Sequence, residues 1–293
     1  MQISVKTLML GYAAIGVAAA VACNSPAQPP STPPAAAVAQ PNIKPAVQPE
    51  AGDPVWHYEG EEGPANWAKL SPKFGMCGSG QAQSPIDIVT TSVTQAATPM
   101  TLRVPPMELK IAHHAHVADA INNGHTVQIN YAGADTLKLG DQSFALVQYH
   151  FHGPSEHTIN GRHTPMEMHL VHKSASNTLA VIGVFIEAGA RNAAFDPIWS
   201  NLPAQKGQET HYPAVMVDVD ALLPAERAAY RYDGSLTTPP CSEGVKWVVL
   251  STPIQLSAEQ IRAFTQLIRD NNRPTRPLNG RTVSADVVAL TPR

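Results

Sequence analysis

Short apolar or alternating segments, each bounded by glycine, asparagine or proline, recur between residues 126 and 250 of the sequence. They are 126–131, 143–152, 167–172, 179–186 and 246–250. Their length and their period of two residues are typical of β-strands. Segment 179–186 is apolar on both faces, which predicts a strand at the centre of a sheet. This pattern constrains the chain to a mostly β fold.

One helix is expected, from residue 257 to about residue 271. Ser257 and Gln260 form a capping box at its start, and apolar residues follow at helical spacing. The helix should end near Asn271, ahead of Pro274. Since no internal repeat is apparent, we predict a single domain, mostly β with few helices, built on a large, mainly antiparallel mixed central β-sheet.

Residues 1–22 have the features of a secretory signal peptide, because Lys6 is followed by an apolar stretch too short for a membrane span. The stretch ends in Ala20-Val21-Ala22-Cys23, which leaves two interpretations open. Either Cys23 is the lipid-modified first residue of a bacterial lipoprotein, or the alanines form an ordinary cleavage signal and the cysteine is incidental. Both predict an exported, periplasmic protein, and the first adds a membrane anchor.

Residues 23–54 contain proline, alanine, glutamine and serine with almost no large apolar residue. Such a segment buries too little surface to offset its ordering entropy, so we expect a disordered tether. It is either a spacer from a membrane or a leader without a role. The remainder, residues 55–293, has the ordinary length of one folded domain. A net charge of −3 without basic clusters argues against a nucleic-acid partner.

The chain has 3 cysteines. Behind an export signal, Cys77 and Cys241 are expected to form a disulfide in an oxidising compartment. The alternative is two buried free thiols. Cys23 is the unpaired cysteine, which agrees with its lipidation.

Histidines at strand spacing suggest a metal site. His150 and His152 project from the same face of segment 143–152, because residues i and i+2 of a strand share a face. A neighbouring strand can bring His169 beside them. Three imidazoles leave one tetrahedral position open, which is the arrangement of a catalytic zinc. The alternative is three buried, hydrogen-bonded histidines without a metal.

Two further residues of these strands can support the proposed zinc ligands. Gln148 lies two residues before His150, and Glu167 lies two residues before His169. Each is placed to accept the ring N–H that does not face the metal, which would fix the tautomer and raise the basicity of the ligand.

Longer motifs around these histidines closely resemble the alpha-class carbonic anhydrases. The matching segments are 83–88, 122–125, 148–157, 167–172, 179–183, 235–240 and 273–278. They span nearly the whole of residues 55–293 in the family's order, so the resemblance is specific. Arg276 departs from the glutamine expected in the last motif, far in sequence from every ligand.

The resemblance implies the alpha-carbonic-anhydrase fold and a catalytic domain at residues 55–293. It also implies reversible hydration of CO2 to bicarbonate and a proton, by attack of zinc-bound hydroxide on CO2. Thr237 would accept a hydrogen bond from the hydroxide and donate one to Glu156, which as a carboxylate only accepts. Thr238 would help to hold bicarbonate.

The remaining site residues are also carried by the resemblance. Val171, Val181, Leu236 and Trp247 would form the apolar wall for CO2, and Val171 shares a strand face with His169 by the i+2 rule. His125 would be the histidine that shuttles the proton to solvent. His157 and His172 would be structural. The sequence leaves the oligomeric state open between a monomer and a homodimer.

Two other classes of function remain to be compared with a zinc lyase. A non-catalytic binding module on this fold would typically lack a zinc histidine, whereas this chain keeps all of them. A different zinc hydrolase such as an esterase is permitted by the ligands, but the His-Glu-x-x-His peptidase helix is absent from the sequence. The cluster of His113, His114 and His116 is interpreted as a solvated face rather than a second metal site.

Overall fold

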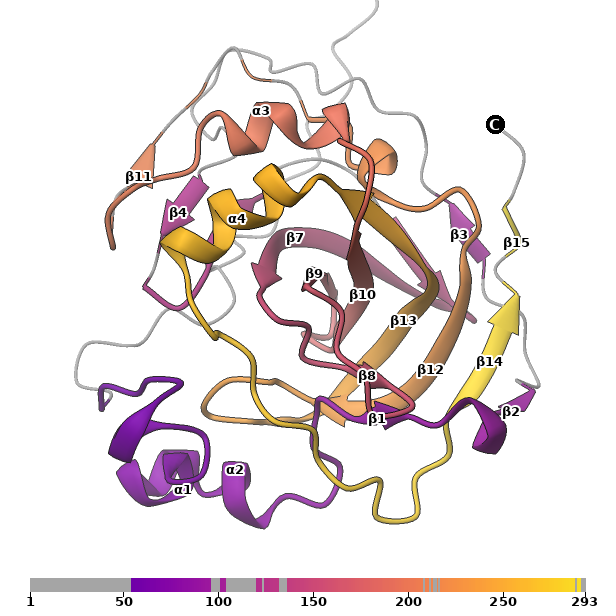
Figure 1. The fold of residues 1–293 in the computed structure, drawn as a ribbon. Helices are drawn as coiled ribbons and strands as arrows, with labels where there is room; N and C mark the ends of the chain where they lie inside the picture. The colour runs from indigo at the N-terminus through magenta and orange to yellow at the C-terminus, as the bar shows by residue number, and fades with distance from the viewer. Residues whose placement is uncertain are drawn as a thin grey trace, which may run out of the picture. The chain divides into compact units, whose positions relative to one another are not determined.

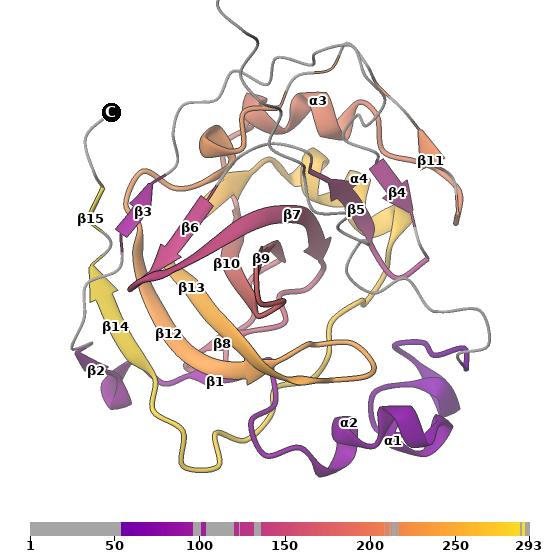
Figure 2. The same cartoon turned by 180° about the vertical axis from the view of Figure 1, so that it is seen from behind.

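The strand-forming segments pair into one large curled sheet in the computed structural model (Figures 1 and 2). The structure describes residues 54–95, 101–103, 120–122, 124–131, 136–207, 209–210, 212, 215, 217–287 and 289–290, all within the unit Ile43–Arg293. The predicted signal peptide, Cys23, the predicted tether up to residue 53 and the cluster of His113, His114 and His116 lie outside the described residues. Among the helices that are described, none is long and apolar enough to span a bilayer.

Strands outnumber helices by far in the described residues. The strands are β1 (Asp87–Ile88), β2 (Thr94–Gln95), β3 (Thr101–Arg103), β4 (Ala120–Asn122), β5 (Val127–Asn130), β6 (Thr136–Leu139), β7 (Gln142–His152), β8 (Thr158–Ile159), β9 (Met166–Ser174), β10 (Leu179–Ala188), β11 (Glu209–Thr210), β12 (Ala228–Ser235), β13 (Glu243–Leu256), β14 (Ser284–Val287) and β15 (Ala289–Leu290). The α-helices are α1 (Trp67–Leu70), α2 (Met76–Ser79), α3 (Asp196–Trp199) and α4 (Ala258–Leu267). Single 3₁₀ turns occupy Gly60–Glu62, Pro72–Phe74, Thr90–Ser92, Ala193–Phe195 and Asp220–Leu222.

The main sheet runs in the order β11-β4-β5-β7-β9-β10-β13-β12-β14-β2, with β6, β3 and β15 joined at its side. Its pairs are mostly antiparallel, and β10 with β13 is the long parallel pair. The apolar run at β10 therefore lies between two long strands, as its pattern predicts. The predicted fold class is confirmed.

Two apolar clusters cover the two faces of the sheet. Even-numbered residues of β9, β10 and β13 enter the larger cluster, together with Ile198 of α3 and Phe264 of α4. Odd-numbered residues of the same strands enter the second cluster. On β7 a bulge between Leu146 and Gln148 shifts this alternation by one residue. As a result, the strand turns Tyr149 toward the larger cluster and leaves His150 on the opposite face.

Helix α4 begins as predicted but ends earlier. The capping box of Ser257 and Gln260 is formed. The helix ends at Leu267 rather than near Asn271, because Ile268 adopts an extended conformation and its side chain is buried. The early end frees Asn271 to contact the sheet, where it bonds to His152.

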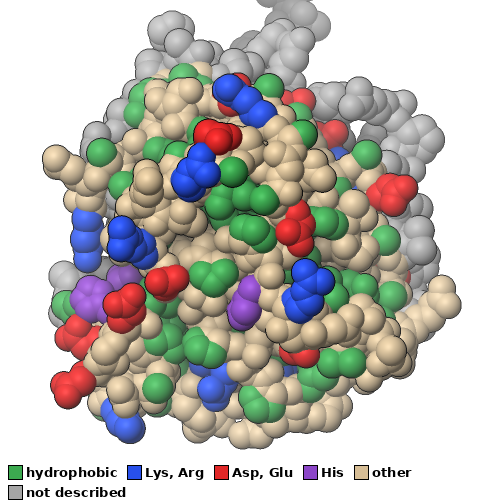
Figure 3. Space-filling view, in the orientation of Figure 1, with side chains coloured by type: hydrophobic (Ala, Val, Ile, Leu, Met, Phe, Trp, Pro, Cys, Tyr) green, Lys and Arg blue, Asp and Glu red, His purple; other side chains and the backbone are tan. Residues whose placement is uncertain are grey.

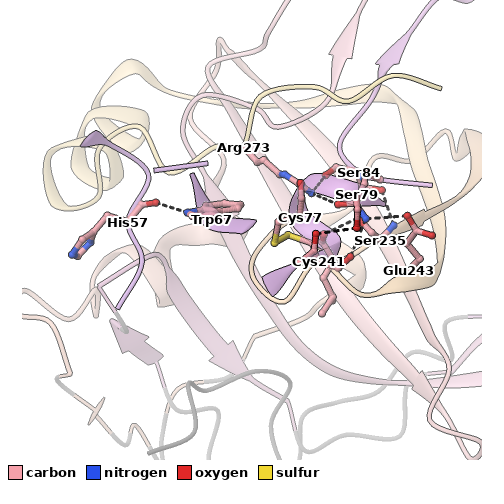
Figure 4. The surroundings of a disulfide bond; sticks show 12 residues. His57, Trp67, Cys77, Ser79, Ser84, Ser235, Cys241, Glu243 and Arg273 are labelled. Carbon is pink, nitrogen blue, oxygen red and sulfur yellow. Dashed lines mark hydrogen bonds between the residues drawn. A yellow bond between two sulfur atoms is a disulfide. The ribbon is translucent and has the colours of Figure 1, made fainter. Parts of the chain in front are cut away.

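The predicted disulfide between Cys77 and Cys241 is confirmed, with an S–S distance of 2.09 Å (Figure 4). It joins α2 to the loop that follows β12. Beside it the guanidinium of Arg273 is almost completely buried and donates to the carbonyls of Cys77 (2.9 Å) and Ser84 (2.8 Å) and to Gln83 Oε1 (2.9 Å). The segment around Cys77–Ser84, the loop of Cys241 and the segment of Arg273, which are distant in sequence, are thus joined at this point.

Candidate metal centre

The pairing of β7 with β9 brings the three predicted ligands together. His150 lies directly opposite His169 in the antiparallel register, so the two side chains share one face. His152 follows on the same face of β7. The ring centroids are 5.0 Å apart for His150 and His152, 5.3 Å for His150 and His169, and 4.6 Å for His152 and His169. One nitrogen from each ring lies within 4.8 Å of the others.

The outer nitrogen of each ring is held by a hydrogen bond. His150 Nδ1 donates to Gln148 Oε1 (2.8 Å), and His169 Nε2 donates to Glu167 Oε1 (2.9 Å), as the strand period predicts. His152 Nδ1 donates to the backbone carbonyl of Asn271 (2.6 Å). These bonds fix the tautomers, so that Nε2 of His150, Nε2 of His152 and Nδ1 of His169 keep their lone pairs.

Asn271 is a functional residue that sequence reasoning missed. Its carbonyl accepts from His152, and its side-chain amide donates to the carbonyls of His125 (2.8 Å) and Phe151 (2.9 Å). No local sequence signal marks an asparagine after a helix as the partner of a histidine more than a hundred residues away. Only the motif that begins at the nearby Arg273 hinted at this segment.

Unpartnered buried atoms test whether these residues fit a metal ion. His152 Nε2 and Glu156 Oε2 are both buried without a hydrogen-bond partner, 3.6 Å apart. His169 Nδ1 lies 3.9 Å from the same carboxylate oxygen. A lone pair and a carboxylate oxygen buried without donors are unfavourable, and a cation held by the three nitrogens would bind the first and offset the charge beside the second. The all-imidazole donor set suits zinc.

Burial keeps two of the rings neutral, the form that binds a metal. The pKa of His150 is well below its ordinary value because of burial, and the neighbouring His152 and His169 lower it further. Burial also lowers the pKa of His152. For His169, burial is outweighed by the charge and hydrogen bond of Glu167, which raise the pKa and place a proton on Nε2.

Glu167 organises the loop beside the ligands. Burial opposes its charge, but His157 and His169 hold the pKa of the carboxyl well below its usual range. It accepts hydrogen bonds from the backbone N–H of Glu156 (2.9 Å) and of His157 (2.9 Å), and from His157 Nδ1 (2.8 Å). Gly183, opposite His169 on β10, leaves room for it, because a Cβ there would lie 2.9 Å from Glu167 Oε1.

Glu156 and Thr237 are both buried, and neither is the surface residue that its type alone would suggest. Glu156 Oε1 accepts from the backbone N–H of Arg273 (2.8 Å). The hydrogen bond from Thr237 to Glu156 implied by the resemblance is not formed among the described residues, where Oε2 has no donor. The loop that carries Thr237 and Thr238 is closed by a bond from Cys241 N to Thr238 O (2.9 Å).

The predicted apolar wall is one contiguous patch. Val171, Val181 and Trp247 belong to the second cluster, and Leu236 packs against it. The ring centroid of Trp247 is 4.9 Å from that of His169, so the patch reaches the ligands. Val147 also belongs to this cluster and was not predicted, because the bulge on β7 is invisible in the strand pattern.

His125 lies outside the ligand group, beside the N-terminal segment. Its ring stacks on Trp56 with centroids 3.8 Å apart and an interplanar angle of 10°. Burial, followed by the positive charges of Lys206 and His57, lowers the pKa of His125 to about 4. His172, predicted as structural, is buried on β9, and its Nδ1 donates to the carbonyl of Leu170 (3.0 Å).

Fold and site together define a class: β proteins whose central sheet presents three imidazoles, with their tautomers fixed, for a single metal ion. The sequence profile of eukaryotic-type carbonic anhydrases matches residues 62–287. The chain belongs to this family, as an alpha-class member, which confirms the resemblance seen in the sequence.

Individual relatives agree with this assignment. A carbonic anhydrase of Pectobacterium atrosepticum is 42% identical over 237 residues, covering 80% of this chain and 92% of that protein. The solved alpha-carbonic anhydrase of Thermovibrio ammonificans, in complex with the inhibitor sulfanilamide, is 41% identical with a TM-score of 0.72, covering 80% of this chain and 100% of that one. Dioscorin, crystallised with ascorbate, is 30% identical with a TM-score of 0.69, covering 80% of this chain and 99% of that one. Since differently named proteins share the fold, the site residues must carry the argument for function.

Proposed function

We propose that this protein catalyses the zinc-dependent, reversible hydration of carbon dioxide to bicarbonate and a proton. The observation that carries the proposal is the ligand triad with its outer nitrogens saturated and His152 Nε2 buried without a partner. Zinc, when bound, lowers the pKa of its water so that a nucleophile exists at neutral pH, a property for which carbonic anhydrases are the established example.

Glu156 and Thr237 are the residues that would orient the nucleophile. A carboxylate only accepts, so a hydroxyl beside Glu156 must donate to it and turn its own lone pairs away. Support comes from the complete burial of Glu156 and from its Oε2 atom, which still lacks a donor. Contacts of this kind often tighten only in the loaded enzyme. Thr238 would bind bicarbonate on the same loop.

The apolar patch would exclude water and receive the substrate. Carbon dioxide carries no net dipole or charge, and Val171, Val181, Leu236 and Trp247 offer it a surface without competing hydrogen bonds. His125 would move the released proton toward solvent. It is connected to the ligands through Asn271, which bonds both to its backbone carbonyl and to His152.

Zinc analysis and stopped-flow measurement of carbon dioxide hydration test the proposal on the purified chain. We expect equimolar zinc and rapid hydration, loss of zinc in His169→Ala, and retained zinc with slowed turnover in Glu156→Gln. Zinc bound without hydration activity would overturn the proposal and favour another zinc hydrolase or a binding protein.

We also propose export to the periplasm. The Cys77–Cys241 disulfide supports this location, because such bonds persist in oxidising compartments. Residues 1–22 would be the signal peptide and residues 23–54 the tether, with Cys23 lipidated. Mass spectrometry of the mature N-terminus tests this. A diacylglyceryl mass on Cys23 supports the anchor, and an unmodified N-terminus at or near Cys23 shows simple secretion.

A further inference from the structure

A second histidine lies next to His125. The ring of His57 is 6.0 Å from that of His125 between centroids. The side chain of His57 is 45% exposed, and its Nε2 lies 3.5 Å from Oε2 of Glu62, which is 49% exposed. In Figure 3, histidine and acidic side chains lie next to one another at the left edge of the view, where the N-terminal segment begins. Solvent therefore reaches His57 directly, whereas His125 is partly covered by Trp56.

The backbone holds His57 in this place. Its N–H donates to the carbonyl of Glu62 (2.9 Å), and its own carbonyl accepts from Trp67 Nε1 (2.8 Å). With both backbone groups bonded, the side chain points outward, away from Trp67 and the disulfide (Figure 4). These two bonds fix the backbone of His57, so the fold keeps this residue beside His125.

We propose that His57 is a second proton-relay residue, which passes protons between His125 and the buffer in solution. This inference rests on the proposed function and assigns His57 a role beyond it. In the hydration direction, a ring N–H of the protonated His125 gives its proton to the unprotonated nitrogen of His57. The centroid separation of 6.0 Å is one that a single bridging water can span. His57 then releases the proton to a buffer base and returns to its neutral form.

Charges around the two rings favour transfer in this order. Partial burial, followed by the charges of Lys206 and His57, disfavours the cation of His125, so a proton does not remain on it. His57 lies beside the carboxylate of Glu62, which can accept a hydrogen bond from a ring N–H, and its half-exposed ring is open to buffer molecules. A relay needs this pair of properties, with a donor that loses its proton readily beside an acceptor open to solvent.

Stopped-flow hydration assays in weak and strong buffer test the relay. We expect His57→Gln, which keeps the size of the side chain but does not titrate, to lose turnover (kcat) severalfold in weak buffer. Its kcat/KM should stay unchanged, and imidazole should restore kcat. Glu62→Gln should show a smaller loss, and the matched control Glu61→Gln, on the same turn, should behave like the wild type.

The double variant separates the possible roles. Because His57 acts through His125, adding His57→Gln to His125→Ala should cause no further loss. A wild-type rate for His57→Gln in weak buffer would overturn the relay, as would a loss of kcat/KM that imidazole does not restore, since this marks a structural role. Absence of hydration in the wild type itself would instead reject the proposed function.

Discussion

Reduction of the Cys77–Cys241 disulfide should destabilise the domain without disturbing its packing. Both cysteines are buried in a small cluster with Trp56, Trp67 and Phe74. A buried thiol packs as a small apolar group, so reduction leaves the native contacts nearly intact. The effect therefore falls on the unfolded chain, which gains freedom when the cross-link is opened.

The loop length sets the magnitude. The two cysteines are separated by 164 positions, and for a loop of this size the chain-entropy relation gives about 5 kcal/mol at 25 °C. Residual structure in the unfolded chain reduces this figure, so we expect a loss of roughly 3–5 kcal/mol. The free energy of unfolding of a typical domain is about 5–15 kcal/mol, so this loss is a large part of it.

Urea unfolding followed by tryptophan fluorescence measures the loss in the oxidised protein and in protein kept reduced. The matched control is the double variant Cys77→Ala/Cys241→Ala, whose unfolding should not respond to the reductant at all. If the reduced wild type unfolds within about 1 kcal/mol of the oxidised form, the cross-link does not constrain the unfolded chain and the reasoning from loop length is wrong.

Three further predictions concern two histidines and the buried Arg273. Burial lowers the pKa of His172 to about 4, below its unfolded value of about 6.5. As the pH falls, the unfolded chain therefore binds this proton before the folded state does. Stability should fall by about 3 kcal/mol between pH 6.5 and pH 4, and urea titrations should show a smaller fall in His172→Gln. Lys206→Gln should raise the pKa of His125, measured by NMR titration, and an unchanged pKa would remove Lys206 as a cause. Arg273→Ala deprives three buried oxygens of their donor and should lower the free energy of unfolding by about 3 kcal/mol or more; a loss below 1 kcal/mol, roughly, would contradict this.

The main strands could be predicted from the sequence because the pattern of apolar and polar side chains depends on which faces of a strand are buried. Segment 179–186 is apolar on both faces, and the structure places it as β10 between β9 and β13. The end of α4 was less predictable. Ile268 continues the helical spacing, but its side chain enters the core from an extended backbone, and that preference depends on tertiary packing.

Much of the candidate site followed from strand periodicity alone. Gln148 and Glu167 bond to their histidines because i and i+2 share a face, a local rule. Asn271 and Val147 were missed for opposite reasons. Asn271 reaches His152 across 119 positions, and Val147 joins the apolar patch only because the bulge on β7 changes the alternation.

By itself, the sequence determined the strand content, the capped start of α4, the histidines of the candidate metal site and the family. These depend on local periodicity and on residue identity, both of which are written in short stretches of chain. Only the tertiary structure decided which nitrogen of each histidine is free, that Glu156 is buried beside two of them, and that His57 lies against His125. Each of these requires segments distant in the chain to meet, and no local pattern encodes the distance between them.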